Sequence, residues 1–217
     1  MKRQEEVIEQ IERAFGANPY PGDNFIQGSY EGCEPYEEIQ AFIGKTDWRT
    51  LDSELLDRRY AALSFFSEAG FRFFLPSYVI ADLREQLRTA DPLFHLSHGF
   101  TSISAVGLAP PSGIVHDTGE TRLVNPKRYG AMTWADHARC RLSIFTREEA
   151  QAIVSYLVYK REHDTLGTNR SRIDAALEKY WLGRAENAPT AESLQAHLRE
   201  EAAFIAEIAR RSEKQKH

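Results

Sequence analysis

Aromatic residues concentrate in one short segment of this 217-residue chain. Residues 60–78 hold seven of the 24 aromatic side chains. Within that segment Phe71, Phe74, Leu75 and Tyr78 recur at the i, i+3, i+4 and i+7 spacing, which places them on one face of a helix. A stripe of this kind is typical of a hydrophobic core rather than of a platform that stacks nucleic-acid bases. The segment therefore predicts a central core helix, and its aromatic residues are not candidates for a functional site.

Helical patterns recur before and after this segment. In the first half, apolar spacing predicts helices over 7–15, 34–43 and 52–60, the first two ended by Gly16 and Gly44. Ser67 is expected to cap a helix that runs to Leu75, and Pro76 to begin a second one that reaches about Arg88.

The second half begins its helical pattern at a capping box. Thr146 and Glu149 have the spacing of that motif, which predicts a helix to about residue 161. Another helix is expected around 173–183. The last, over about 190–212, carries an apolar stripe that requires a partner surface, either its own domain or a second subunit.

The middle of the chain lacks this periodicity. From Asp91 to Asp136 no helical pattern is visible, and Pro110 and Pro111 mark its clearest break. Short strands are expected at 113–115 and 121–124. We therefore predict a mainly α single domain over residues 1–217, a bundle of about six to eight helices with an irregular insertion at about 91–136 that can hold a small β-hairpin.

Cysteine usage and hydropathy predict the compartment. Cys33 and Cys140 lie more than a hundred residues apart, which fits a reducing interior better than an oxidising one. The N-terminal segment carries glutamates where a signal peptide needs an apolar run, and no stretch approaches eighteen apolar residues. We expect a cytoplasmic protein with no membrane association.

The net charge of −5 divides unevenly along the chain. Residues 23–57 hold nine acidic side chains against two basic ones, whereas residues 121–147 hold six basic ones against one acidic. This asymmetry predicts binding to another protein, most simply a basic one, or else two segments that neutralise each other or only face solvent. The candidate binding residues are Asp23, Glu34, Glu37, Glu38, Arg128, Arg139 and Arg141. Asp23 has two further roles open to it, as a structural cap or as an ion-pair partner of Arg72.

Two short motifs supply a candidate metal site. His95 and His98 are three residues apart, as are His137 and Cys140, and four such donors would satisfy a structural zinc ion. The alternative is that these are ordinary histidines and an inert cysteine. The sequence contains no His-Glu-x-x-His motif, no Gly-x-Ser-x-Gly elbow and no phosphate-binding glycine loop. A basic cluster with Tyr129 and Trp134 interleaved favours nucleic-acid binding, but a pI near 5.8 disfavours it.

Three stretches together resemble a bacterial family of small uncharacterised proteins. They are Tyr-Pro-Gly-Asp-Asn-Phe-Ile at 20–26, Leu-Ser-Phe-Phe-Ser-Glu-Ala-Gly-Phe-Arg-Phe-Phe-Leu-Pro-Ser-Tyr at 63–78 and Leu-Ser-Ile-Phe-Thr-Arg-Glu-Glu-Ala-Gln-Ala-Ile at 142–153. The resemblance spans about residues 15–159 and implies no activity. It implies that the loop at 20–23 and the segment at 71–78 form one structural unit, and it does not extend to the tail after Gly183.

Taken together, these patterns favour a protein-interaction module without catalytic activity, an immunity or antitoxin-like role being one form of it. A metal protein or enzyme that uses the four zinc-ligand candidates is the alternative, and nucleic-acid binding is the third hypothesis. The C-terminal helix is a candidate surface for homo-oligomers.

Overall fold

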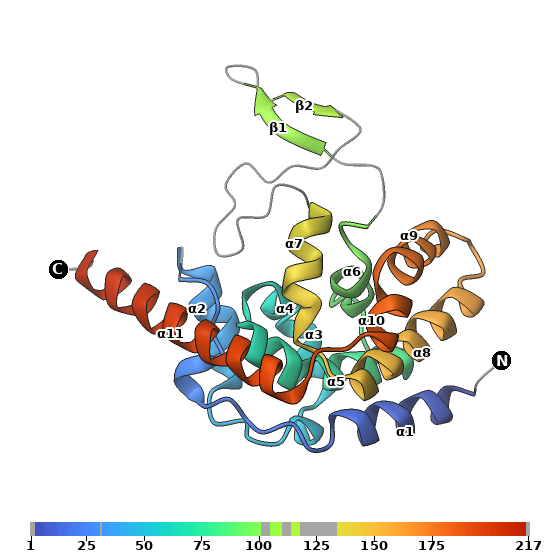
Figure 1. Ribbon diagram of the computed structural model, residues 1–217, viewed down its shortest axis with the longest axis horizontal. Helices are drawn as coiled ribbons and strands as arrows, with labels where there is room; N and C mark the ends of the chain where they lie inside the picture. The colour runs from blue at the N-terminus through green and yellow to red at the C-terminus, as the bar shows by residue number, and fades with distance from the viewer. Residues whose placement is uncertain (1–2, 31, 101–104, 110–113, 118–133, 216–217) are drawn as a thin grey trace.

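The computed structural model describes residues 3–30, 32–100, 105–109, 114–117 and 134–215. The protein is a mainly α-helical domain, as predicted (Figure 1). Its α-helices are α1 Gln4–Phe15, α2 Glu34–Ile39, α3 Ser53–Arg58, α4 Ala62–Phe65, α5 Glu68–Leu83, α6 Pro92–Ser97, α7 Trp134–Arg141, α8 Arg147–His163, α9 Arg170–Ala176, α10 Leu182–Glu186 and α11 Ala191–Gln215. Several have only one or two turns, so the sequence pattern resolved fewer elements than the fold contains.

Helix α5 lies at the centre of the core. Thirteen of its 16 residues are buried, and Phe71, Phe74, Leu75 and Tyr78 have no exposed surface, which confirms the predicted aromatic stripe. The Phe74 ring stacks on Phe66 with centroids 4.9 Å apart, and further aromatic rings surround it at edge and tilted angles. These side chains hold the helix in place, and Phe73 also lines a cavity described below.

The predicted break at Pro76 was wrong, because α5 runs through this residue without ending. A proline inside a helix cannot donate to the carbonyl four residues earlier, here that of Arg72, at a cost of about 3 kcal/mol. Burial of α5 on nearly every side offsets this cost, because each large apolar side chain contributes roughly 1.5–3 kcal/mol. Tertiary packing therefore overrides the local signal, and α5 ends at Leu83 rather than near Arg88.

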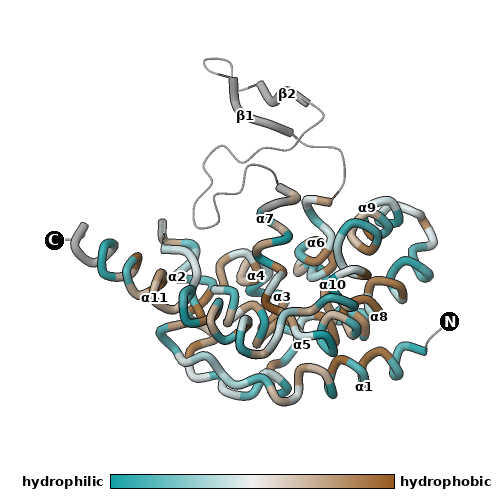
Figure 2. The backbone as a smooth tube through the Cα atoms, viewed as in Figure 1, coloured by the Kyte–Doolittle hydropathy of each residue, from teal (hydrophilic) through white to brown (hydrophobic). Residues whose placement is uncertain are grey.

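Helix α1 packs against both α8 and α5. The apolar residues of α1 predicted from spacing are all buried, and both hydrogen bonds of the predicted capping box at Thr146 and Glu149 are present. Helices α9 and α10 are joined through a π-helical turn, Leu177–Trp181, whose Trp181 ring is fully buried and donates to the Leu96 carbonyl at 2.7 Å. Figure 2 shows hydrophobic residues recurring between hydrophilic ones along α1 and α11.

The proline-rich loop, residues 18–24, leads into a segment before α2 that is hydrogen-bonded to the start of α5. Gly28 N–H donates to the Phe65 carbonyl, and Ser67 N–H donates to the Ile26 carbonyl, each at 2.8 Å. The two backbones approach so closely that a Cβ on Gly28 would lie 2.7 Å from the Phe66 carbonyl oxygen. Glycine is therefore required there.

Tyr20, in the same loop, packs edge-on against α5. The centroid of its ring lies 5.3 Å from that of Phe73. The loop and the aromatic helix thus form the single unit that the family resemblance implied.

The described part of the insertion holds an antiparallel pair of strands, β1 Ala105–Ala109 and β2 Ile114–Asp117. A hairpin was predicted, with strands at 113–115 and 121–124. The structure instead pairs the segment at 114–117 with the preceding residues, and residues 121–124 lie outside the described part. Among the described helices, none has the length and apolar character needed to cross a membrane.

Helix α11 extends the predicted C-terminal helix by three residues, to Gln215, and its first half lies against α5. Leu194 and Ile205 are buried on its inner face. Its apolar stripe therefore has a partner surface within its own domain. The chain termini lie at opposite ends of the long axis of the molecule (Figure 1).

Candidate functional site

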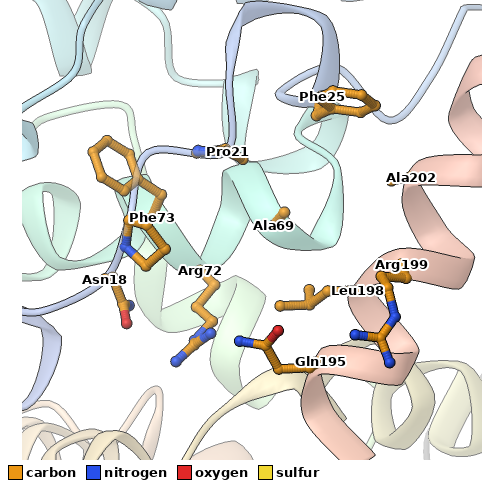
Figure 3. A pocket seen from close by; sticks show the side chains of 11 residues that line it. Asn18, Pro21, Phe25, Ala69, Arg72, Phe73, Gln195, Leu198, Arg199 and Ala202 are labelled. Carbon is orange, nitrogen blue, oxygen red and sulfur yellow. The ribbon is translucent and has the colours of Figure 1, made fainter. Parts of the chain in front are cut away.

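A cavity of about 300 Å³ lies between the proline-rich loop, the N-terminal half of α5 and helix α11 (Figure 3). We call it the α5–α11 cavity. It is lined by Asn18, Pro19, Pro21, Phe25, Ala69, Arg72, Phe73, Gln195, Leu198, Arg199 and Ala202. Apolar side chains form most of this wall, whereas Arg72, Gln195 and Arg199 lie together on one side of it in Figure 3. The cavity is therefore amphipathic.

Arg72 is held by a buried ion pair beneath the cavity. Its Nε–H donates to both carboxylate oxygens of Glu149, at 3.1 and 2.9 Å. The Glu149 side chain is 0% exposed and that of Arg72 is 13% exposed. Glu149 also accepts the Thr146 N–H at 2.8 Å, so the capping box of α8 fixes the carboxylate that orients the arginine.

The far end of this guanidinium carries donors without acceptors. A guanidinium has five N–H groups, and Glu149 takes only the one on Nε. Among the residues that the structure describes, nothing accepts a hydrogen bond from Nη1 or Nη2 of Arg72. The Nδ2 of Asn18, which also lines the cavity, is buried and has no hydrogen-bond partner in this part of the chain either. The Nη groups of Arg72 would be satisfied by a ligand that brings acceptor oxygens.

The charge of the cavity wall is positive. Two arginines, Arg72 and Arg199, line it, and none of the lining residues is acidic. Glu149 offsets the charge of Arg72 from below, whereas Arg199 is exposed and has no ion-pair partner among the described residues. The cavity adjoins an outer cleft of about 1020 Å³, which shares Asn18, Arg72 and Leu198 with it. The other charged residues that line this outer cleft are of both signs, Arg13, Arg147, Glu148 and Glu149.

Helix α11 supplies one wall of the cavity and is attached by polar contacts. The Glu201 side chain is 4% exposed and accepts the Glu68 and Ala69 N–H groups at the N-terminus of α5, the latter at 2.9 Å. His197 is paired with the Glu68 carboxylate. A carboxylate at a helix N-terminus satisfies unpaired N–H groups and is favoured by the helix dipole. Glu201 therefore acts as a cap supplied from a distant helix.

The predicted acidic binding residues are divided between structural and surface positions. Asp23 accepts the Tyr20 hydroxyl at 2.5 Å and the Gly44 N–H at 2.8 Å. These two hydrogen bonds lower the pKa of the Asp23 carboxyl below its usual value. The alternative in which Asp23 pairs with Arg72 was wrong, since Arg72 pairs with Glu149. Asp23 is a structural cap of its loop.

Three glutamates of helix α2 complete the predicted acidic set. Glu38 is partly buried and lies 3.9 Å from Arg59, and burial raises its pKa. Glu34 and Glu37 are exposed and make no ion pair with any residue that the structure describes. Only these last two remain available to a partner.

The two predicted basic residues that the structure describes, Arg139 and Arg141, differ in their surroundings. The Arg141 guanidinium packs over the Phe71 ring at 4.9 Å and donates to the Leu63 carbonyl. It interacts electrostatically with Glu68 and Glu201. The charge of Arg141 is therefore used inside the fold, opposite α5 and α11 rather than opposite the acidic segment 23–57. Arg139 is exposed, and Arg128 lies outside the described residues.

Three of the four predicted zinc ligands lie near one another. Burial, together with the positive charges of Arg141 and His98, lowers the pKa of His95 from 6.5 to about 3. Burial, Arg141 and His98 also lower the pKa of His137. A site where Arg141 disfavours a proton also disfavours a metal cation.

Cys140 lies on α7 with His137. Within the described part of the chain, no group of three or more His, Cys, Asp or Glu side chains is placed to hold a metal ion.

The cavity was not found from the sequence, and no local pattern could have revealed it. Arg72 was considered only as a partner of Asp23, and Glu149 only as a capping residue. The two are 77 positions apart, and the opposite wall comes from α11, more than a hundred residues beyond Arg72. An ion pair between two separate helices produces no regular spacing in the sequence. The pair of Arg72 and Glu149 therefore becomes visible only in the structure.

A family model described as a family of unknown function, DUF6714, matches residues 3–185. The chain belongs to this family. The DUF6714 match includes the proline-rich loop, α5 and α8, and with them Arg72, Glu149 and Asn18. It ends before α11, so the second wall of the cavity lies outside the DUF6714 region. Searches among curated proteins and among solved structures found no match to the chain.

Proposed function

We propose that this DUF6714 protein is a binding protein that holds a small organic molecule in the α5–α11 cavity. The observation that carries the proposal is the arginine at its wall. Arg72 is fixed by Glu149 and turns donor groups without acceptors toward an otherwise largely apolar cavity. Small-molecule sites typically combine apolar walls with a few fixed polar groups, and about 300 Å³ is at the lower end of their volumes.

The proposal does not require chemistry at the site. Its polar groups are two guanidiniums and two carboxamides, of which Arg72 is fixed by Glu149, and all of them can position a ligand by hydrogen bonding. Neither a nucleophilic side chain nor a histidine lines the cavity. The proposed role is that of a binding module, with a small molecule in place of the protein partner that the sequence favoured.

A ligand-observed NMR screen of small fragments tests this proposal. We expect several fragments to bind at one site and to displace one another. Replacing Ala202 with Trp fills the cavity and should abolish their binding, whereas Ala203→Trp, one residue further along α11 on an exposed position, should not. Fragments that bind equally well to both variants would place the site elsewhere and contradict the proposal.

A second candidate function, binding to a basic protein, is supported by the exposed surface of α2. We call Glu34, Tyr36 and Glu37 the α2 surface. Tyr36 is 59% exposed, and both glutamates lack an ion-pair partner among the described residues. Aromatic residues are enriched at protein interfaces, and opposite charge speeds association. Recognition of this kind by a cytoplasmic bacterial protein would fit an immunity or antitoxin-like role.

Charge reversal on α2 tests the second candidate. Protein carrying both Glu34→Lys and Glu37→Lys is compared with protein carrying Glu5→Lys and Glu9→Lys, two exposed positions on α1. We expect a basic partner captured in stoichiometric amount by the unmodified protein to be lost only with the α2 changes. Equal capture by both forms would show that the α2 surface is not the docking site.

A further inference from the structure

We infer that the ligand of the α5–α11 cavity is a small carboxylic acid with an apolar body, bound as its monoanion. The inference rests on the proposed function and specifies its ligand class. The carboxylate would lie against Nη1 and Nη2 of Arg72. The apolar body would pack among the rings and methyl groups that form the rest of the wall.

The Arg72 guanidinium is open at the end that carries Nη1 and Nη2. Glu149 occupies the Nε side of Arg72, with both of its oxygens on that one N–H. The end that carries Nη1 and Nη2 therefore remains open, and this end presents two parallel N–H groups at the spacing of a carboxylate. A carboxylate can accept one hydrogen bond from each of these groups. A single hydroxyl or amide oxygen on the ligand cannot make this paired contact.

The net charge of the cavity wall matches a monoanion. The pair of Arg72 and Glu149 is neutral together, so the uncompensated charge of the wall is the single positive charge of Arg199. This balance suits one negative charge. A phosphate group carries nearly two negative charges at neutral pH, more than the single positive charge of this wall balances. A carboxylate is therefore favoured over a phosphate.

The apolar part of the cavity can accommodate the body of the ligand. Pro21, Phe25 and Ala202 lie on the side of the cavity away from the Arg72 guanidinium (Figure 3). A volume of about 300 Å³ accommodates one ring or a short branched chain with its acid group. Burial of that body contributes roughly 25 cal/mol for each Å² removed from water. Recognition thus combines an apolar contact with a directed carboxylate contact.

Isothermal titration calorimetry with 3-phenylpropanoate, the neutral 3-phenylpropanamide and 3-phenylpropan-1-ol, and inorganic phosphate tests the inference. We expect the carboxylate to bind at least tenfold more tightly than either neutral analogue and phosphate alone not to bind. A short peptide that ends in phenylalanine with a free carboxylate should bind at least tenfold more weakly than the small acid. Tighter binding of the peptide would overturn the assignment to a small molecule.

Variants of the cavity wall test whether the preference for a carboxylate depends on Arg72. Arg72→Lys keeps a cation for Glu149 but loses the paired Nη donors, so we expect it to weaken 3-phenylpropanoate binding at least tenfold and to leave the alcohol unchanged. Arg147→Lys in the outer cleft is the matched control. Should Arg72→Lys fail to fold by circular dichroism, Arg199→Gln at an exposed position replaces it, with an expected two- to fivefold loss.

The outcomes separate this inference from the proposed function. Equal binding of all three phenyl compounds, abolished by Ala202→Trp, would support a ligand cavity and overturn the carboxylate preference. Binding of phosphate that competes with 3-phenylpropanoate would also overturn it. Failure of every probe and of the fragment screen would contradict the proposed function itself.

Discussion

The Nε–H of Arg72 on α5 is bonded to both carboxylate oxygens of Glu149 on α8, at 3.1 and 2.9 Å, and neither side chain is more than 13% exposed. This contact joins the central helix to the N-terminus of α8. It also places a guanidinium at the wall of the α5–α11 cavity. One ion pair therefore has a structural role on its Glu149 side and a proposed binding role on its Arg72 side.

Replacing Glu149 with Ala should destabilise the fold. The change leaves Arg72 partly buried without its partner and removes half of the capping box, and loss of one partner of a buried pair costs about 3–5 kcal/mol. Urea denaturation measures the loss. Glu148→Ala, at the exposed neighbouring position, is the control and should change the free energy of unfolding by less than about 0.5 kcal/mol. Equal effects of the two changes would mean that the pair contributes no net stability.

Replacing Glu201 with Ala should release α11 from the body. Glu201 accepts two N–H groups at the start of α5, and a hydrogen bond to a charged group contributes about 1.5–3 kcal/mol. Amide hydrogen exchange should then accelerate throughout 191–211 and remain slow in α5 and α8. The exposed neighbour provides the control, since Glu200→Ala should leave exchange in α11 unchanged. Protection that persists in the Glu201 variant would show that Leu194 and Ile205 suffice to hold the helix.

A ligand in the cavity should have the opposite effect on α11. Because the cavity has walls on both α5 and α11, a bound molecule contacts both and stabilises the attached helix. We expect saturating 3-phenylpropanoate to slow proteolysis within α11 severalfold. The Ala202→Trp variant, which cannot accommodate the ligand, should show no change on addition of the compound. Protection of both proteins alike would indicate an effect unrelated to the cavity.

Those parts of the fold whose signal is local could be predicted from the sequence. The stripe of Phe71, Phe74 and Tyr78 and the capping box at Thr146 lie within single helices, and both predictions were confirmed. The prediction at Pro76 failed because a local rule was applied where burial of the whole helix decides the outcome. A strand near 114–117 was predicted, but its partner at 105–109 was not, since the turn signals around it allow more than one pairing.

The candidate site depends on contacts that sequence spacing does not record. The acidic segment 23–57 was considered as a surface for a basic partner or as solvent-facing charge. In the structure, Asp47 and Asp52 instead accept backbone N–H groups at the starts of short helices, and Asp57 accepts three from residues 88–90. Aspartate is favoured at such positions because its short side chain reaches the nearby backbone. Charge counts along a chain therefore overstate the charge that a partner can reach.

Asp57 should make stability fall in acid. The N–H groups of Thr89, Ala90 and Arg88 hold its pKa below the ordinary value of 3.8, so the folded protein binds a proton less readily than the unfolded chain. The contribution is complete above pH 3.8 and is lost as the pH falls through the lower folded value. Urea denaturation between pH 2 and 5 should show a shallower acid loss in Asp57→Asn than in the unmodified protein, with Glu54→Gln as the exposed control. Identical acid profiles would contradict the lowered pKa.

His95 should make stability fall at a higher pH. Burial, Arg141 and His98 lower its pKa from 6.5 to about 3, so the unfolded chain takes up a proton in a range where the folded protein does not. Its contribution is complete above pH 6.5 and declines from there toward pH 3, by at most about 1.4 kcal/mol per pH unit. His95→Phe keeps a ring beside Phe71 and removes the titration, so the slope of unfolding free energy between pH 4 and 6 should decrease. His163→Phe, at an exposed position, should retain the full slope. An unchanged slope in His95→Phe would show that His95 is protonated in the folded protein, and would remove the electrostatic argument against a metal ion beside Arg141.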